Sequence, residues 1–287
     1  MKWKLLFIAG LLSLTSCKQA SQTVVVAGDS WAAFVCTYNS LDKAFLKVGI
    51  KDVATSSTCM TTTKIGIHAD NWEGTPFDKA TQLSLRDPKV KALYLSLGGN
   101  DLIALWNKAM TADQENALFD HVISHLETII QKYQSIRPDI RILISGYDFP
   151  RFTLNHPVKD YSKAYDDMGR PSPLELNSAL LRFSKRVAEV ADQKKVFYIQ
   201  HYGLMQYYYG NTDTGLAAQQ TLPPDQISPA SDMTQTGGDI QSQTDKQAML
   251  KVQVNPFIIY DAFHLNQDGF DHVAEHAVSI YLNNWFK

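Results

Sequence analysis

Three short segments of the chain combine residue types that could perform nucleophilic catalysis. They are Gly28-Asp29-Ser30-Trp31, Gly98-Gly99-Asn100-Asp101 and Asp261-Ala262-Phe263-His264. A serine hydroxyl is a weak nucleophile until a base removes its proton, and a histidine commonly serves as that base. Ser30 and His264 could form such a pair. Asp261 lies three residues before His264, so in a turn its carboxylate could orient the imidazole and stabilise the imidazolium.

The second segment offers donors for the charge that such a reaction creates. An attacked ester develops negative charge on its carbonyl oxygen, which needs preorganised hydrogen-bond donors. Asn100 could donate a side-chain N–H, and the backbone N–H of Ser30 would lie at a helix N-terminus, where the helix dipole also favours an anion. Plainer interpretations exist, because Asp29 and Ser30 could simply cap a helix and residues 98–101 could only end a strand.

Strands and helices alternate along the chain, and the three segments fall at their ends. Strands are predicted at 23–27, 50–57, 91–97, 140–144 and 196–200, and helices at 31–47, 68–85 with an interruption near 74–76, 112–134, 173–192 and 266–285. Alternation together with strands that are apolar throughout indicates a parallel sheet covered on both faces. We therefore predict one α/β domain over residues 23–287, a three-layer α/β/α sandwich of about five strands. Ligands in such folds gather at the carboxyl ends of the strands.

One long segment, residues 205–258, departs from this alternation. It carries few helix or strand signals and is rich in Gln, Thr, Ser, Asp and Gly. Long irregular segments inside a compact domain are often functional. The sequence leaves open whether this insertion is a lid over the substrate or a passive surface loop.

The catalytic segments together resemble the conserved blocks of the SGNH, or GDSL-type, hydrolase family. Residues 28–31 (GDSW) resemble its first block, with Trp31 where Leu is common, and residues 98–101 (GGND) resemble its third. Asp261 and His264 resemble the last block in content, in spacing and in position near the C-terminus. The resemblance covers the chain in order and spacing except for the insertion at 205–258.

The second block of that family is matched less closely. Gly66, ahead of a segment that carries Trp72, resembles its glycine, although the Ser/Thr-rich stretch before it (55–63) is atypical. The resemblance implies a flavodoxin-like parallel sheet, no metal or other cofactor, and an oxyanion hole built from Ser30, Gly66 and Asn100. It also implies hydrolysis of small-molecule esters such as lipids or acylated sugars.

The N-terminal residues predict export and lipid anchoring. Lys2 and Lys4 precede an apolar run, Leu5–Leu14, that is too short to span a bilayer. Leu14-Thr15-Ser16-Cys17 resembles the lipobox of bacterial lipoproteins. We therefore expect a signal peptide at 1–16, lipidation of Cys17 and a polar tether at 17–22, with membrane contact through the anchor. In a diderm bacterium, Lys18 after the lipidated Cys favours the outer membrane by analogy with lipoprotein sorting.

The two remaining cysteines, Cys36 and Cys59, allow two interpretations. An exported protein meets oxidising conditions, so they could form a disulfide. They could equally be two buried thiols, because the sequence does not give the Cα separation that a disulfide requires.

Charge and histidine spacing argue against other classes of function. The chain has 27 Lys and Arg against 29 Asp and Glu, without a basic run, so a nucleic-acid partner is not expected. His272 and His276 lie four residues apart in an H-x-x-E-H pattern, which resembles a zinc-protease motif. Only eleven residues follow for a third ligand, so we expect a solvated helix face there. His121 and His125, also four apart, are expected to be exposed.

The sequence therefore predicts an ester hydrolase of the bacterial envelope that forms an acyl-enzyme on Ser30. Two alternatives remain: a carbohydrate O-deacetylase of the same fold, and a binding lipoprotein that keeps the fold without catalysis. The acyl chain and the alcohol of the substrate depend on the shape of the pocket, and the oligomeric state leaves no mark in the sequence.

Overall fold

Five strands form a parallel sheet in the computed structural model, which describes residues 20–152, 159–194, 196–221, 223–224, 237–254 and 257–287. The strands are β1 (Gln22–Gly28), β2 (Val53–Thr55), β3 (Val90–Ser96), β4 (Arg141–Ser145) and β5 (Phe197–Ile199). Their spatial order is β2-β1-β3-β4-β5, and every neighbouring pair is parallel. This is the flavodoxin-like order, so the predicted fold class is confirmed.

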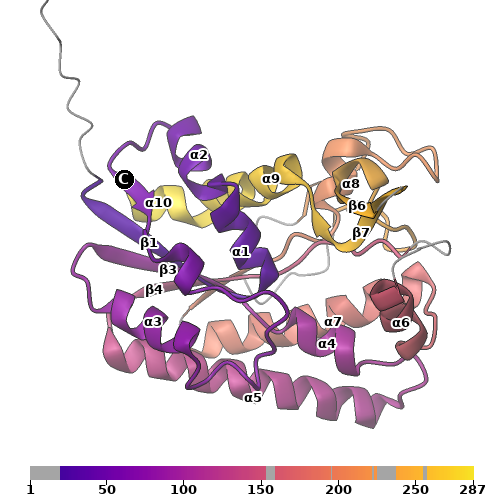
Figure 1. The fold of residues 1–287 in the computed structure, drawn as a ribbon, viewed down its shortest axis with the longest axis horizontal. Coiled ribbons are helices and arrows are strands. Elements are labelled where there is room, and N and C mark those ends of the chain that lie inside the picture. Colours follow the sequence, from indigo (N-terminus) through magenta and orange to yellow (C-terminus); the bar gives the residue numbers. More distant parts are fainter. Residues whose placement is uncertain (1–19, 153–158, 195, 222, 225–236, 255–256) are drawn as a thin grey trace, which may run out of the picture.

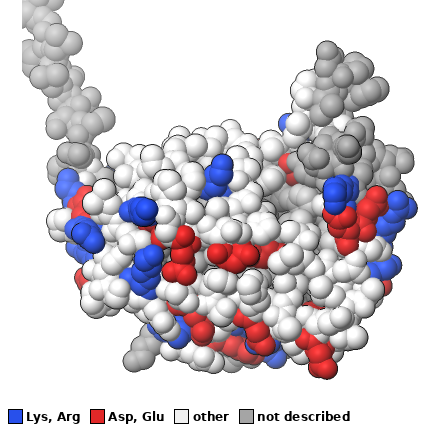
Figure 2. All heavy atoms as spheres, turned by 60° about the horizontal axis from the view of Figure 1, so that its bottom comes forward, with Lys and Arg blue, Asp and Glu red and all other residues white. Residues whose placement is uncertain are grey.

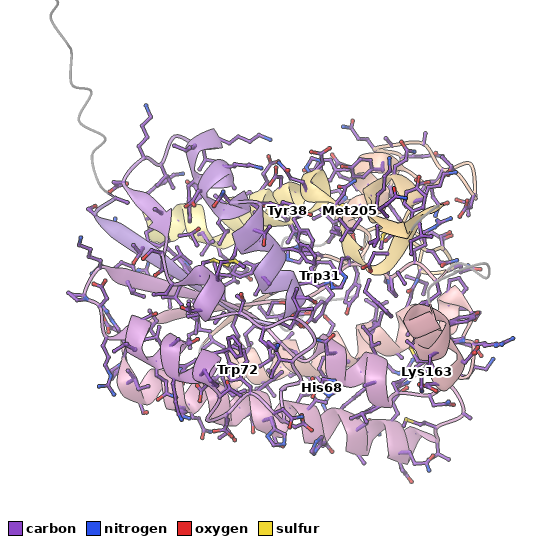
Figure 3. All side chains as sticks on the ribbon, viewed as in Figure 1. Trp31, Tyr38, His68, Trp72, Lys163 and Met205 are labelled. Carbon is purple, nitrogen blue, oxygen red and sulfur yellow. A yellow bond between two sulfur atoms is a disulfide. The ribbon has the colours of Figure 1, made fainter. Side chains whose placement is uncertain are left out.

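Helices cover both faces of this sheet (Figure 1). One layer holds α1 (Ser30–Thr37), α2 (Ser40–Lys47) and α9 (Gln267–Ala277), and the other holds α3 (Pro76–Leu85), α5 (Ala112–Ile136) and α7 (Pro173–Gln193). Because side chains alternate along a strand, Val24 and Val26 of β1 pack into the first layer while Val25 and Ala27 pack into the second. Figure 3 shows Trp31 and Tyr38 in the first layer and Trp72 in the second.

Local sequence explains where these helices begin. Thr111 and Ser172 form capping boxes at the starts of α5 and α7, each with the polar side chain three residues later. The helix expected over 31–47 is two helices, because Asn39 adopts a left-handed conformation with φ of 52°. Asparagine tolerates that conformation better than most residues, so the break occurs there.

The segment expected to be irregular, 205–258, has structure at both ends. Helix α8 (Leu204–Tyr209) begins it, and η2 (Lys246–Ala248) and β6 (Met249–Val254) end it. Strand β6 pairs antiparallel with β7 (Phe257–Leu265), and this hairpin was not predicted. Its strands carry mixed polar and apolar residues, so the buried-strand signal that revealed the parallel sheet is missing from them.

The remaining elements connect this frame. They are η1 (Cys59–Thr61), α4 (Gly99–Leu105), α6 (Lys159–Asp167), and η3 (Val278–Leu282) with α10 (Asn283–Trp285), which continue α9. Basic and acidic side chains are both spread over the face turned forward in Figure 2. Within the described residues no helix has the length and apolar character needed to cross a bilayer. The predicted signal peptide and Cys17 lie outside the described residues.

Candidate active site

Ser30, His264 and Asp261 meet at one point although they come from opposite ends of the chain. His264 Nε2 lies 2.8 Å from Ser30 Oγ, and His264 Nδ1 lies 2.9 Å from Asp261 Oδ2. The carboxylate accepts the Nδ1 proton, which leaves Nε2 free to accept the proton of the hydroxyl. This arrangement can activate a serine for attack on an electrophilic carbon.

The end of β1 presents Ser30 by means of a turn that only glycine permits. Gly28 has φ of +129°, and a Cβ added to it would lie 1.8 Å from the carbonyl oxygen of Ser96 on β3. The chain then turns into α1, where Asp29 Oδ1 accepts the N–H of Trp31 at 3.0 Å. Ser30 is thus the first residue of α1, and its hydroxyl faces the carboxyl edge of the sheet.

A bulge in β7 presents Asp261 and His264. The ladder pairs Met249 with Leu265 and Lys251 with Tyr260, so residues 261–264 stand opposite a single residue of β6. Bulges re-aim side chains and are common beside active sites. Asp261 Oδ1 accepts the backbone N–H groups of Phe263 and His264, at 2.7 and 2.9 Å, and thereby holds the bulge closed.

Trp31 connects the nucleophile helix to this bulge. Its indole N–H donates to the carbonyl oxygen of Phe263 at 3.2 Å. On the same helix, Phe34 packs against His264, with their ring centroids 5.0 Å apart. Trp31 and Phe34 therefore connect α1 to the segment that carries His264.

Asn100 also faces the site, and its orientation is fixed. Its Nδ2 donates to the carbonyl oxygen of Ile67 at 2.9 Å. An amide nitrogen carries two hydrogens, so a second N–H remains for a substrate oxygen. Gly66 lies in the loop that supplies Ile67 and has φ of +73°, but it is not among the residues that line the cavity beside Ser30.

Tyr147, which we did not predict, joins the two turns that carry Ser30 and Asn100. Its hydroxyl donates to Asp29 Oδ2 at 2.6 Å and accepts the N–H of Gly99 at 2.9 Å. Burial raises the pKa of Asp29 to about 6, and the hydrogen bond from Tyr147 opposes that rise. Tyr147 follows the end of β4, so the same strand-end rule that selected the other segments could have found it.

A cavity of about 110 Å³ opens beside the triad. Its walls include Ser30, Asn100 and His264 together with a group of apolar side chains. These are Ile103, Pro150, Phe152, Leu176, Leu180 and Phe263. Apolar walls with few convergent polar groups are typical of small-molecule sites.

The other sequence predictions have clear outcomes. Cys36 of α1 and Cys59 of η1 form a disulfide, with their Cα atoms 5.8 Å apart. The expectation of a solvated face is wrong for His276, whose side chain is buried and whose Nδ1 lies 3.0 Å from Nδ1 of His201. The ring of His272 instead stacks on Tyr208.

Comparison with known proteins gives similarity to solved structures alone. No protein-family model matches the chain, and no curated protein matches its sequence. One similar structure is a gut microbial diltiazem-metabolizing enzyme, which is 13% identical with a TM-score of 0.49. The match covers 92% of this chain and 47% of that enzyme, so this chain spans about half the length of the enzyme.

Two further similar structures are closer to this chain in length. The periplasmic domain of a lipopolysaccharide acetyltransferase from Salmonella ser. Paratyphi A is 15% identical, with 94% of this chain and 86% of that chain covered and a TM-score of 0.46. A carbohydrate esterase of family 3 from Talaromyces cellulolyticus is 10% identical, with 92% and 98% covered and a TM-score of 0.48. Such values assign no activity or substrate to this chain.

Proposed function

We propose that this protein is a serine ester hydrolase of the SGNH type. The observation that supports it is the line of hydrogen bonds from Ser30 through His264 to Asp261 at the wall of an apolar cavity. Ser30 comes from near one end of the sequence and the Asp261–His264 pair from near the other, and the three side chains stand in the order that nucleophilic catalysis requires. Asp261 and Ser30 are both buried, so their geometry is held by packing.

The reaction proceeds in two halves. Ser30 Oγ bonds to the acyl carbon while its proton passes to His264 Nε2, and the same proton then moves to the departing alcohol as the ester C–O bond breaks. Water next attacks the acyl-enzyme, gives a proton to His264 and releases the acid, and the proton returns to Ser30. Asp261 stabilises the imidazolium in both halves.

Three donors would stabilise the oxyanion. Ser30 N–H lies in the first turn of α1, where backbone N–H groups lack intrahelical partners. Asn100 contributes its second amide hydrogen. Gly66 N–H would join them if its loop moves toward the cavity when substrate binds. Loss of one such donor in a hydrolase costs about 10²–10³ in kcat.

The apolar walls favour an acyl group longer than acetyl. A dry apolar cavity of 150 Å³ can hold benzene, so a cavity of about 110 Å³ has room for a short aliphatic chain. A sugar ring would need polar partners, and most of the wall is hydrocarbon. We therefore favour an esterase for short acyl chains over the sugar O-deacetylase.

A fluorophosphonate probe tests the proposal directly. The wild-type chain should be labelled covalently, and Ser30→Ala should not be. Ser135→Ala, at an exposed serine on α5, serves as the matched control and should keep the label. Failure of the folded wild-type chain to react would instead indicate a binding protein that retains the fold.

Chain-length preference tests the cavity. Ile103→Trp should fill it and lower kcat/KM for a p-nitrophenyl butyrate substrate at least tenfold relative to the acetate. Leu105→Trp, on the same helix but exposed, should leave the ratio unchanged. If the butyrate-to-acetate ratio of kcat/KM is the same in Ile103→Trp and Leu105→Trp, the acyl chain binds elsewhere.

Export and lipid anchoring through Cys17 remain part of the proposal. The lipobox-like residues at 14–17 are the support. Cells grown with labelled palmitate should incorporate it into the wild-type chain and not into Cys17→Ala, and the variant should leave the membrane fraction. Label in both would contradict the assignment.

A further inference from the structure

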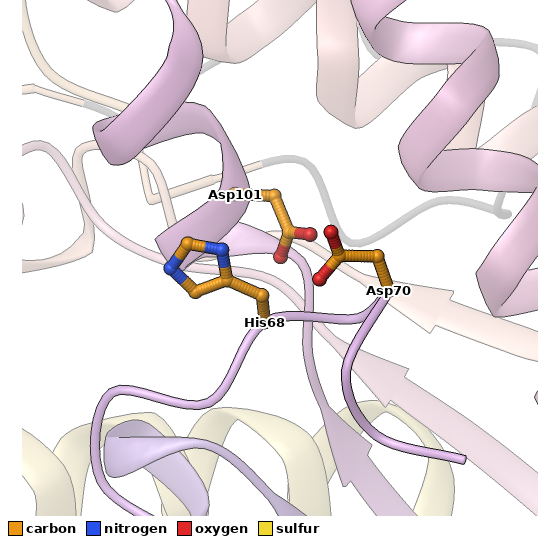
Figure 4. Close-up of side chains that lie close together, drawn as sticks. All are labelled: His68, Asp70 and Asp101. Atoms are coloured by element: carbon orange, nitrogen blue, oxygen red, sulfur yellow. The ribbon is translucent and has the colours of Figure 1, made fainter.

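A second group of functional side chains lies behind Asn100. His68 and Asp70 come from the loop that follows η1, and Asp101 comes from the first turn of α4. One ligand-capable atom from each of the three lies within 4.8 Å of the others. Figure 4 shows the imidazole and the two carboxylates converging on one space.

The spacing within this cluster differs from that of hydrogen-bonded partners. Among the described residues, no hydrogen bond or ion pair joins His68 to either carboxylate. Ligands of one ion, with bonds of about 2.1 Å, lie about 3.3–4.2 Å from each other. The three atoms lie within 4.8 Å of one another, so they would have to move closer together to share an ion.

The charges of the cluster also favour a cation. Asp70 and Asp101 are two carboxylates that face each other, and Asp101 is fully buried. The Asp101 carboxylate accepts the backbone N–H of Ala69, with 2.9 Å between Ala69 N and Asp101 Oδ2. This hydrogen bond orients the carboxylate, and its oxygens keep further lone pairs for an ion. A bound cation would reduce the repulsion between these two carboxylates and compensate the charge of the buried Asp101.

A fourth donor stands next to the cluster on α5. His121 Nε2 lies 3.8 Å from Asp70 Oδ2, and its side chain is about half exposed. The four residues offer two imidazole nitrogens and two carboxylate oxygens. Nitrogen and oxygen donors in equal number suit Zn²⁺ and similar first-row ions, whereas Ca²⁺ and Mg²⁺ prefer oxygen alone.

We propose that His68, Asp70, Asp101 and His121 form a binding site for a divalent transition-metal ion, with Zn²⁺ as the best fit. The ion lies apart from the triad and takes no part in bond breaking. It would connect the loop that contains Ile67 to α4 and α5. Because Ile67 holds the Asn100 side chain, the ion would stiffen the wall that carries the oxyanion donor.

Calorimetric titration of the metal-stripped full-length protein with Zn²⁺ tests this site. We expect one ion per chain, and at least a tenfold weaker Kd in His68→Ala and in His121→Ala. The matched control is His272→Ala. His272 also lies near a carboxylate, because its Nδ1 is 3.6 Å from Oε2 of Glu275, three residues later in the sequence. The His272→Ala variant should bind as the wild type does.

Several outcomes would overturn the proposal. They are absence of saturable Zn²⁺ binding, unchanged affinity in either cluster variant, and tighter binding of Ca²⁺ than of Zn²⁺. Circular dichroism establishes that the variants are folded. Substitution by Co²⁺ should give visible absorption bands of mixed nitrogen and oxygen ligation. Every readout is metal binding, so the result does not depend on the esterase proposal.

Discussion

A single hydroxyl, that of Tyr147, holds the nucleophile turn and the oxyanion turn at a fixed separation. It donates to Asp29 and accepts from Gly99. Its ring also fits closely over Gly99, where a Cβ would lie 2.5 Å from it. Tyr147 therefore acts through its neighbours as a positioning residue.

Removal of that hydroxyl should impair turnover more than binding. Tyr147→Phe removes the hydroxyl partner of Asp29 Oδ2 and of the Gly99 N–H, while Asp29 Oδ1 keeps the N–H of Trp31; loss of such a buried partner costs about 1–3 kcal/mol. We expect kcat to fall about ten- to a hundredfold with KM nearly unchanged, measured with a short p-nitrophenyl ester. Tyr208→Phe, outside the cavity, is the control. A change confined to KM would contradict a positioning role.

Asp29 should make stability depend on pH with a sign opposite to that of a salt-bridged carboxylate. Its pKa is about 6 in the folded chain and 3.8 when unfolded. Between these values only the folded chain holds the proton, so stability falls as the pH rises through this window. The loss amounts to at most about 3 kcal/mol for a shift of two pKa units.

The Asp29→Asn variant isolates this effect because it cannot titrate. Urea unfolding at pH 4.5 and pH 7 should show that the advantage of the wild type over Asp29→Asn shrinks at the higher pH. Buried His201 and His276, whose pKa values are lowered by burial, change both proteins alike and cancel in the difference. If the free energies of unfolding of the two proteins change with pH by the same amount, the prediction is refuted.

Among elements, the contact between α1 and α9 decides where the nucleophile stands. Phe270 of α9 is fully buried and packs against Trp31 and Phe34 of α1, with ring centroids 5.2 and 5.3 Å apart. The same two α1 residues contact His264 and its neighbour Phe263. Packing of two helices thereby fixes the distance from serine to histidine.

Phe270→Ala should lower both stability and activity. Loss of a buried aromatic ring costs about 3–5 kcal/mol, and the cavity left behind would let α1 shift. Phe286→Ala, which removes a buried ring packed on Phe45, should cost comparable stability but spare kcat. Denaturant unfolding and steady-state kinetics compare the two, and equal losses of kcat would refute a specific role for Phe270.

The disulfide joins α1 to η1 and should stabilise this frame. It closes a loop with a sequence separation of 23 residues, for which chain entropy gives about 3 kcal/mol. A variant with both Cys36→Ala and Cys59→Ala should lose roughly this much in urea unfolding. Reductant should destabilise the wild type alone. A wild-type protein insensitive to reductant would argue against the bond.

At the scale of the whole molecule, the site exists because the sheet order places β1 beside β3. The carboxyl ends of these two strands carry Ser30 and Asn100, and the crevice between them is where this topology binds ligands. The last part of the chain then adds the β7 bulge with Asp261 and His264, and α9 closes the first layer.

A chain that ends at Asn266 tests how far the site depends on the complete fold. It retains every triad residue but lacks α9, η3 and α10 with their buried side chains. We expect little native structure by circular dichroism and no labelling by the fluorophosphonate probe, whereas the full chain gives both. A labelled and folded fragment would show that α9 is dispensable.

The sequence determined the class of fold and predicted the candidate chemistry. Apolar strands that alternate with helices predicted the parallel sheet, and residue types at strand ends selected Ser30, Asn100, Asp261 and His264. These signals are local, because burial and backbone preference act on neighbouring residues. The pairing of Cys36 with Cys59 stayed open, since a Cα separation is not a local property.

Tertiary structure alone decided how these residues meet. The β6–β7 hairpin and its bulge, the hydroxyl of Tyr147 between two turns, and the cluster of His68, Asp70 and Asp101 all join residues that are distant in sequence or carry no local pattern. Their positions follow from packing of whole elements, and neither periodicity nor spacing along one segment encodes the distance between two others.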